Sequence, residues 1–120
     1  MTEERLQLGA EGEEAAVRFL RKLGAKIIER NLRSPVGEID MSARLKKQLL
    51  FVEVKTRSNQ LYGTPAEAVG HRKQQQIIRT AQWYLQRGHG KNLQPRFDVV
   101  SVLLRSGELE IEYFPNAFEL

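Results

Sequence analysis

Residues 36–57 read VGEIDMSARLKKQLLFVEVKTR, and this stretch decides the fold. Residues 36–45 and 49–57 each predict a β-strand, because apolar side chains recur at every second position or in a short unbroken run. The polar residues 46–48 separate the two segments. We therefore expect the two strands to pair antiparallel as a hairpin, since such a short connection joins neighbouring antiparallel strands.

The register of this hairpin determines which side chains meet. With residues 46–47 at the centre of the turn, Asp40 faces Glu53 and Glu38 faces Lys55. A loop one residue longer would shift the pairing by one position and separate these side chains. In the expected register the opposite face is apolar and carries Ile39, Met41, Leu50, Val52 and Val54.

Two opposed carboxylates need a positive partner, because like charges directly across a strand pair are destabilising. A divalent cation would satisfy Asp40 and Glu53, since two carboxylates completed by water and phosphate oxygens form a typical Mg²⁺ environment. The carbonyl group of Val54 is a further candidate ligand. Lys55, on the same face, could orient an attacking water or offset the charge of a phosphate. These residues therefore predict a metal-dependent site for phosphodiester chemistry.

An ordinary hairpin is the alternative, because it would also place charged residues on one solvated face. Residues 49–54 favour the metal site, since all of them except Glu53 are apolar. Leu49 and Phe51 also share the expected face of Glu53, so that face is not simply polar. A charge inside such a strand is seldom kept without a partner.

The rest of the chain predicts two helices and three more strands. Thr2 is placed to cap a helix that ends near Leu23. The capping-box sequence TPAE at residues 64–67 starts a second helix, whose continuity at Gly70 is open; residues 73–87 continue it, and Gly88 ends it. The other expected strands are residues 25–32, 96–104 and 108–114. The order αβββαββ predicts an α/β domain in which helices pack on a mixed five-stranded sheet.

The composition predicts a single domain that spans residues 1–120. The absence of cysteine excludes a disulfide scaffold, a cysteine-ligated metal site and a thiol nucleophile. Since the longest apolar run is residues 49–52 and the first residues are acidic, we expect neither a membrane span nor a signal peptide. A cytoplasmic protein without a membrane partner is therefore expected. The net charge of +4 by itself favours nucleic acid or an anionic membrane surface, and of these we expect nucleic acid as the partner.

The sequence GEID at residues 37–40, followed by FVEVKTR at residues 51–57, resembles the PD-(D/E)xK nuclease signature, with Ile39 where that signature has proline. Along nearly its whole length the chain also resembles the YraN-like (UPF0102) family of small bacterial proteins, which is similar in fold to archaeal Holliday-junction resolvases. The further matching residues are Gly9, residues 12–16, Phe19, Leu20, residues 81–85, residues 96–100, Ala117 and Phe118.

This resemblance implies a restriction-endonuclease-like three-layer core with a nuclease site that depends on Mg²⁺ or Mn²⁺. Asp40 and Glu53 would be the metal ligands, and Lys55 would be the catalytic lysine. The superfamily often adds an acid from the first helix, where Glu13 and Glu14 both stand. We choose Glu13, because it precedes the inward-facing positions 16 and 17 by three and four residues.

Other charged residues have both a functional and a structural interpretation. Arg57, Arg72 and Lys73 could contact phosphates of a nucleic acid, or they could be exposed charges at the ends of their elements. Glu38 could support the metal site or pair with a lysine on its own face. Asp98, inside an apolar strand, could support the site or pair with a buried base.

Together these features predict a metal-dependent endonuclease that hydrolyses phosphodiester bonds in nucleic acid. The resemblance favours DNA, with branched DNA in repair or recombination as the substrate. It also implies a homodimer, because resolvases cut two strands symmetrically. The alternatives are a non-catalytic nucleic-acid-binding module on a nuclease fold and a protein-interaction subunit of a repair complex.

Overall fold

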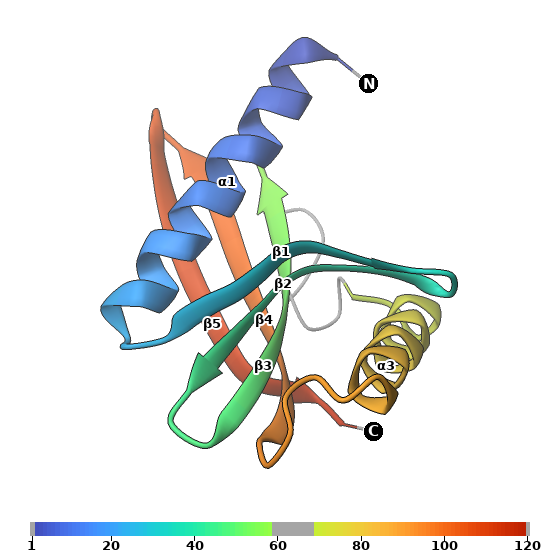
Figure 1. The fold of residues 1–120 in the computed structure, drawn as a ribbon. Helices are drawn as coiled ribbons and strands as arrows, with labels where there is room; N and C mark the ends of the chain where they lie inside the picture. The colour runs from blue at the N-terminus through green and yellow to red at the C-terminus, as the bar shows by residue number, and fades with distance from the viewer. Residues whose placement is uncertain (1, 59–68, 120) are drawn as a thin grey trace.

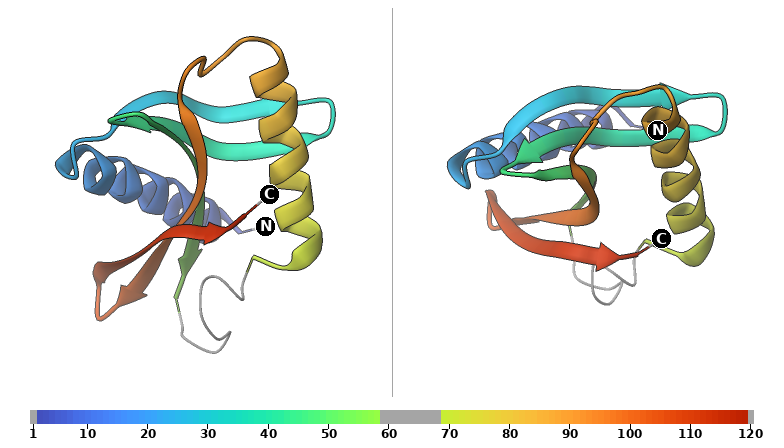
Figure 2. Two further views of the ribbon diagram at one scale, coloured as in Figure 1. Left: turned by 90° about the horizontal axis from the view of Figure 1, so that it is seen from below. Right: turned by 60° about the horizontal axis from the view of Figure 1, so that its bottom comes forward.

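The chain forms one mixed five-stranded sheet with a long helix packed on each side (Figures 1 and 2). The computed structural model describes residues 2–58 and 69–119. The elements in chain order are α1 (Glu3–Lys22), β1 (Lys26–Ser34), β2 (Gly37–Leu45), β3 (Gln48–Arg57), α3 (His71–Gln86), β4 (Gln94–Arg105) and β5 (Glu108–Phe118). This order confirms the expected αβββαββ arrangement.

The strands follow one another across the sheet in sequence order, β1-β2-β3-β4-β5. Strands β3 and β4 pair in parallel, from Gln48↔Gln94 to Arg57↔Leu103, and the other neighbouring strands pair antiparallel. The parallel pair needs a crossover connection, and α3 lies within it. Strand β3 is the middle strand of the five and is covered on both faces, which explains its nearly unbroken apolar sequence.

Two apolar clusters lie on opposite faces of the sheet, because successive side chains of a strand point to opposite sides. The cluster under α1 includes Leu50 and Val52 of β3. The cluster under α3 includes Leu49 and Phe51 of the same strand. Glu53 continues the alternation of Leu49 and Phe51, so it shares their face as predicted, and this face lies on the α3 side.

The β2–β3 hairpin has the register that the sequence predicted. Its pairs run from Leu45↔Gln48 to Met41↔Val52, with residues 46–47 in the turn. Beyond Met41, the described pairing of β2 continues only with β1, up to Ser34↔Gly37. The end of the β1–β2 hairpin therefore extends past β3 toward α3 (Figure 1).

This extension changes the surroundings of Ile39. The alternation predicted that Ile39 shares the apolar face of Met41, but Ile39 packs in the α3 cluster, whereas Met41 packs under α1. The expectation for Ile39 was wrong because it assumed that β2 stays alongside β3 over its whole length.

The ends of the helices follow local capping chemistry. The Thr2 side chain accepts a hydrogen bond from the backbone N–H of Arg5 at 3.3 Å, which confirms the expected N-cap of α1. The chain leaves α1 through Gly24, whose φ of +97° is one that glycine adopts readily. The capping-box residues 64–67 lie outside the described residues, and α3 itself is described from His71.

Among the described residues, no helix is long and apolar enough to cross a membrane.

Candidate metal and phosphate site

The two carboxylates that the hairpin register predicted lie together. Asp40 stands one position beyond the Met41↔Val52 pair, beside Glu53. Its Oδ2 accepts a hydrogen bond from the backbone N–H of Val54 at 2.7 Å, and its side chain also hydrogen-bonds the carboxyl group of Glu53. The adjacent strands β2 and β3 therefore hold the two acidic groups against each other.

Glu53 is buried in the middle of the sheet, with only 5% of its side chain exposed. Burial raises the pKa of Glu53 to about 8, and the hydrogen bond and negative charge of Asp40 act in the same direction. The positive charges of Lys73 and Lys55 partly oppose this rise. Without a cation, Glu53 therefore holds its proton more tightly than an ordinary glutamate does.

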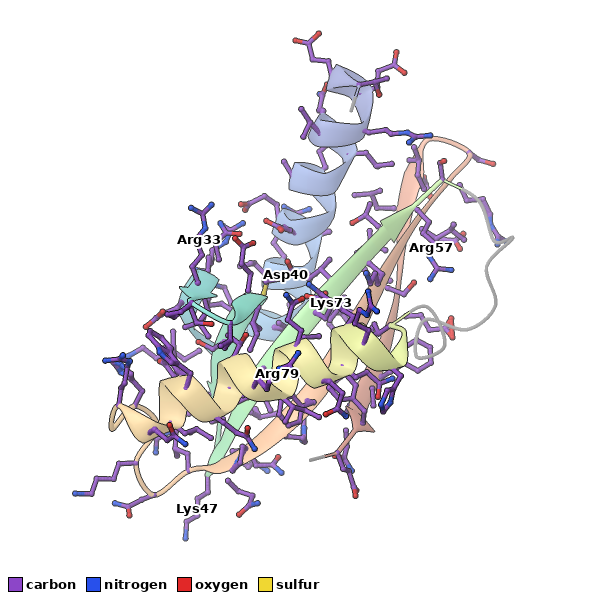
Figure 3. The ribbon with its side chains drawn as sticks, turned by 90° about the vertical axis from the view of Figure 1, so that its right-hand side faces the viewer. Arg33, Asp40, Lys47, Arg57, Lys73 and Arg79 are labelled. Atoms are coloured by element: carbon purple, nitrogen blue, oxygen red, sulfur yellow. The ribbon has the colours of Figure 1, made fainter. Side chains whose placement is uncertain are left out.

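Lys73 approaches this pair from the other side, since it projects from the first turn of α3. Its Nζ lies 3.6 Å from Oε2 of Glu53, and Figure 3 shows it next to Asp40. The sequence predicted Lys73 as a phosphate contact but did not predict its ion pair with Glu53. Lys55 lies close enough to Glu53 to influence its pKa, and it comes from the same strand.

The acid proposed from the first helix also lies near the pair. The pKa of Glu13 is raised, first by burial and then by the negative charge of Asp40, whereas Arg30 lowers it. Arg30 contacts both helix acids, with distances of 4.0 Å to Glu13 and 2.6 Å to Glu14. Glu14 is the more exposed of the two. The geometry thus puts Glu13, the residue chosen from the sequence, in the field of Asp40.

Gly12 allows α1 to approach β3 at this point. A Cβ atom at Gly12 would lie 2.1 Å from Oγ1 of Thr56, so a larger residue there would push the helix and the strand apart. The close approach of α1 to the end of β3 is what brings Glu13 near Asp40.

The other predicted residues lie around the site rather than in it. Glu38 is exposed and pairs with Arg33 at 3.5 Å, so the expectation that it faces Lys55 was wrong: its strand partner is Arg33 of β1, because the pairing of β2 with β3 ends at Met41. Arg72 is exposed at the start of α3, and Arg57 is partly buried at the end of β3. Figure 3 shows Arg33, Arg57 and other basic side chains on the same face as Asp40.

The donor set fits a hard divalent cation. Within residues 2–58 and 69–119, no three acidic, histidine or cysteine side chains converge closely enough to form a metal cluster by themselves. Asp40 and Glu53 would therefore supply two ligands, and water, a phosphate or the Val54 carbonyl would complete the coordination. Few protein ligands with several waters are typical of Mg²⁺.

Beside the carboxylates lies a groove that the sequence did not predict. It has a volume of about 460 Å³ and runs between the turn that joins β1 to β2 and the helix α3. Its lining residues are Ser34, Pro35, Val36, Gly37, Glu38, Lys73 and Gln76. The sequence marked residues 33–35 only as the end of a strand, since nothing local indicates that a distant helix faces this turn.

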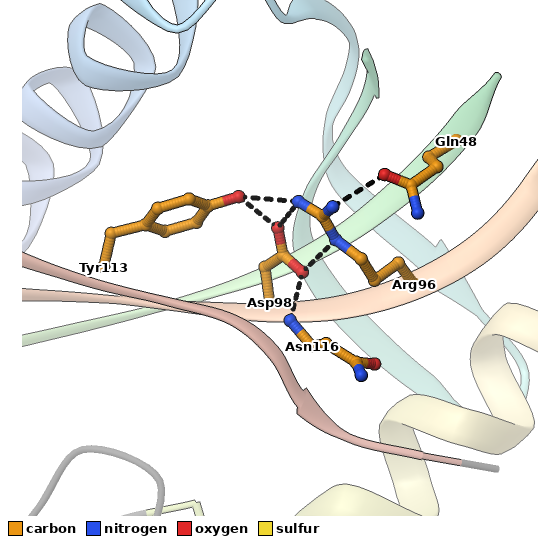
Figure 4. Close-up of polar contacts among 5 residues, drawn as sticks. All are labelled: Gln48, Arg96, Asp98, Tyr113 and Asn116. Atoms are coloured by element: carbon orange, nitrogen blue, oxygen red, sulfur yellow. Dashed lines mark hydrogen bonds and ion pairs between the residues drawn. The ribbon is translucent and has the colours of Figure 1, made fainter. Parts of the chain in front are cut away.

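Asp98 belongs to a separate buried network on the other side of the sheet (Figure 4). Arg96 binds both of its carboxylate oxygens, at 2.9 and 2.8 Å, and the Tyr113 hydroxyl donates to Oδ2. The backbone N–H of Asn116 donates to Oδ1 at 2.9 Å. The interpretation in which Asp98 pairs with a buried base is therefore the one that the geometry supports.

One protein-family model matches most of this chain. The Uncharacterised protein family UPF0102 matches residues 12–102, a span that contains Glu13, Asp40, Glu53, Lys55 and Lys73. The chain belongs to the UPF0102 family. The candidate site therefore lies wholly within the region that this family shares.

Curated UPF0102 relatives are similar over nearly their whole length. The UPF0102 protein of Syntrophotalea carbinolica is 54% identical over 120 residues, covering 100% of this chain and 98% of the relative. The UPF0102 protein of Desulfosudis oleivorans is 45% identical over 99% of this chain and 95% of the relative. That of Caldanaerobacter subterraneus subsp. tengcongensis is 44% identical over 92% of this chain and 93% of the relative.

Among solved structures, this UPF0102 chain shows a weak similarity to Pyrococcus furiosus SfsA in complex with Ca²⁺. The TM-score is 0.36 and the sequence identity is 14%. The match covers 98% of this chain and 65% of the SfsA chain, so this chain spans less than two thirds of that protein.

Proposed function

We propose that this UPF0102 protein is a metal-dependent endonuclease that hydrolyses phosphodiester bonds in nucleic acid, with DNA as the substrate. The observation that carries the proposal is the hydrogen-bonded carboxyl pair of Asp40 and Glu53, with Lys73 3.6 Å from Glu53. Two acidic groups held together on neighbouring strands, with Glu53 buried in a largely apolar strand, are costly, and a catalytic or metal-binding role explains why they are kept there.

The sequence signature and the fold support the same proposal. The acids lie on neighbouring strands, and Lys55 follows Glu53 by two residues on one face of β3, which is the arrangement of a PD-(D/E)xK site in a restriction-endonuclease-like core. The helix on each side of the mixed sheet agrees with the three-layer core that the resemblance implies. The proposal includes a homodimer, because the resolvases that the family resembles cut two strands symmetrically.

Each residue of the site has a distinct role in this mechanism. Asp40 and Glu53 would hold Mg²⁺ or Mn²⁺ together with the Val54 carbonyl, and Glu13 would add further negative charge near them. The bound cation would supply positive charge for the phosphodiester transition state. Lys55 would orient the attacking water, and Lys73 would contact the phosphate once a cation neutralises Glu53.

Cleavage assays test this proposal directly. We expect the wild-type protein to cut labelled DNA in the presence of Mg²⁺ or Mn²⁺ and to lose the activity when the cation is chelated. The variants Glu53→Gln, Asp40→Asn and Lys55→Met should each reduce the rate by roughly 10²-fold or more, as is usual when an electrostatic contributor is removed. Glu112→Gln is the matched control, because it neutralises an exposed acid elsewhere in the sheet.

A thermal-shift measurement adds a readout that does not depend on catalysis. Mn²⁺ at about 100 times its dissociation constant should stabilise the wild-type protein by roughly 3 kcal/mol. This stabilisation should be lost in Asp40→Asn and kept in Glu112→Gln. If wild-type protein cuts no branched, single-stranded or double-stranded DNA or RNA with either cation, the proposed endonuclease function is wrong.

A non-catalytic nucleic-acid-binding module is the second candidate. It is favoured by the finding that no third metal-ligating side chain joins the pair among the described residues. Binding by such a module would weaken steeply with salt and would survive the Glu53→Gln substitution. The two candidates are therefore separated by measuring binding and cleavage on the same variant.

A further inference from the structure

The groove between the β1–β2 turn and α3 opens beside the two carboxylates. Lys73 connects the two features, because it lines the groove and its Nζ also lies 3.6 Å from Glu53 Oε2. A nucleic-acid strand that follows the groove would therefore bring one of its phosphates to Lys73. The same phosphate would then lie next to Asp40 and Glu53.

The size of the groove suits a single nucleotide. Its volume of about 460 Å³ lies within the range of roughly 300–1,000 Å³ that is typical of sites for one small molecule. A base pair with both of its backbones is far larger than this space. The groove therefore suits one strand with its base unpaired.

The two walls differ in chemistry in the way that a nucleobase requires. Most of the exposed lining is polar, and Pro35 and Val36 at the turn add a smaller apolar surface, with Val36 43% exposed. The polar groups are Ser34 and Glu38 beside the turn and Gln76 on α3. A nucleobase has an apolar face and a hydrogen-bonding edge, so it can contact both kinds of surface.

The turn is held in a fixed shape against α3. Oγ of Ser34 accepts hydrogen bonds from the backbone N–H groups of Val36 and Gly37, at 3.2 and 3.1 Å. The same hydroxyl lies 2.9 Å from the Gly37 carbonyl and 3.4 Å from Oγ1 of Thr80 on α3. A surface formed in advance loses little entropy when a ligand binds.

The charges around the groove favour an anionic ligand. Glu38 is the acidic residue in the lining, and Arg33 offsets it at 3.5 Å. Lys73 lines the groove itself, and Figure 3 shows Arg33 and Arg79 on the same face. A phosphate at Lys73 would therefore have Lys73, Arg33 and Arg79 near it, and a cation at Asp40 and Glu53 would offset the negative charge of those two acids.

We propose that this groove binds one unpaired nucleotide of the strand whose phosphate lies at Asp40 and Glu53. Its base rests against Pro35 and Val36, and its phosphate contacts Lys73. This inference rests on the proposed function and deepens it, because it makes a strand with unpaired nucleotides the substrate instead of a continuous duplex.

The test compares single-stranded and fully paired DNA in binding experiments at low salt with Ca²⁺ present, so that a cation offsets the charge of Glu53 and leaves Lys73 able to contact the phosphate. The probe is a thymidine oligonucleotide with one 2-aminopurine, whose fluorescence reports the surroundings of that base. We expect the wild-type protein to bind the single strand about tenfold more tightly than the duplex, which corresponds to about 1.4 kcal/mol. The aminopurine signal should change on binding.

Two matched variants decide whether the groove is responsible. Val36→Asp places a carboxylate in the groove and should weaken single-strand binding about tenfold, with little effect on duplex binding. Ile28→Asp makes the same change on β1, outside the groove lining, at a residue that is 42% exposed, and should behave like wild type. Equal effects of the two variants would overturn the inference. So would duplex binding as tight as single-strand binding, or no binding of either DNA.

The outcome is independent of catalysis, so the two proposals can fail separately. Val36-dependent binding of the single strand without any cleavage in Mg²⁺ or Mn²⁺ would leave the groove assigned and refute the endonuclease. Cleavage of DNA without any dependence on Val36 would refute the groove and leave the endonuclease standing.

Discussion

At position 53 a carboxyl group lies among apolar side chains, and its protonation links the site to the stability of the protein. Burial and Asp40 raise the pKa of Glu53 to about 8, from an ordinary value of 4.5. The folded protein therefore binds this proton more tightly than the unfolded chain does. The stability that this proton contributes is fully present below pH 4.5 and is lost as the pH rises to about 8.

We predict a pH dependence of stability that disappears in Glu53→Gln. In a chelating buffer, the free energy of unfolding of the wild type should fall between pH 4.5 and pH 8, by up to about 5 kcal/mol. The amide of Glu53→Gln has no proton to lose in this range, so that variant should lack this decrease. Urea unfolding at several pH values measures the difference, and parallel curves for the two proteins would contradict it.

Lys73 shows which part of the site could not be predicted at the residue scale. Lys73 stands at the polar start of a helix. Its sequence neighbours fit an exposed charge as well as they fit a residue that contacts a ligand. Only the packing of α3 against β2 and β3 brings it to Glu53, which is twenty positions earlier in the chain. The periodicity of apolar residues predicts which side chains share a face of one element, but it does not predict a contact between elements that are far apart in the chain.

At the scale of elements, the position of α1 depends on the small residue at its contact with β3. A Cβ atom at Gly12 would lie 2.1 Å from Oγ1 of Thr56, whereas one at Gly9 would have no atom within 4 Å. The two glycines therefore give a matched pair within one helix, since both would gain helix propensity as alanine.

We predict opposite effects for these two substitutions. Gly9→Ala should stabilise the protein by about 0.5–1 kcal/mol, because alanine costs less conformational entropy in a helix. Gly12→Ala should destabilise it by about 1–3 kcal/mol, as overpacking usually does. Thermal and urea unfolding measure both changes. Thr56→Ala added to Gly12→Ala should restore part of the loss, and a stabilised Gly12→Ala protein would refute the close contact.

The hairpin that carries Asp40 and Glu53 was predictable because its information is local. Apolar alternation and the polar residues 46–47 are enough to place Met41 opposite Val52, and the carboxylates follow from that register. The groove at the far end of the same hairpin was not predictable. Its existence depends on the separation of β2 from β3 and on the approach of α3, which are tertiary effects, and Ile39 was misplaced for the same reason.

At the scale of the whole molecule, the network around Asp98 joins three strands. Arg96 links Asp98 of β4 to the side chain of Gln48 on β3, at 2.7 Å, and Tyr113 and Asn116 belong to β5. Asp98 is fully buried, and each of its oxygens has partners. It lies on the opposite side of the sheet from Glu53, because Val99, its neighbour, is the strand partner of Glu53.

We predict that breaking this network destabilises the protein without changing the site. Asp98→Ala should lower the free energy of unfolding by about 3–5 kcal/mol, because it leaves the largely buried charge of Arg96 without its partner. The double variant Asp98→Leu with Arg96→Met should recover most of that loss. Urea unfolding gives both values, and the Mn²⁺ thermal shift should persist. A double variant no more stable than Asp98→Ala would contradict this account.

The parallel pairing of β3 with β4 also affects the timing of folding. The partner of Arg57 on β4 is Leu103, so the central ladder closes only after the 45 residues between these two positions have been made. Contacts between such distant segments form late, because the entropy of closing the loop must be overcome first. We therefore expect the Asp40–Glu53 pair to stay open to water until α3 and β4 have been made and can pack against β3.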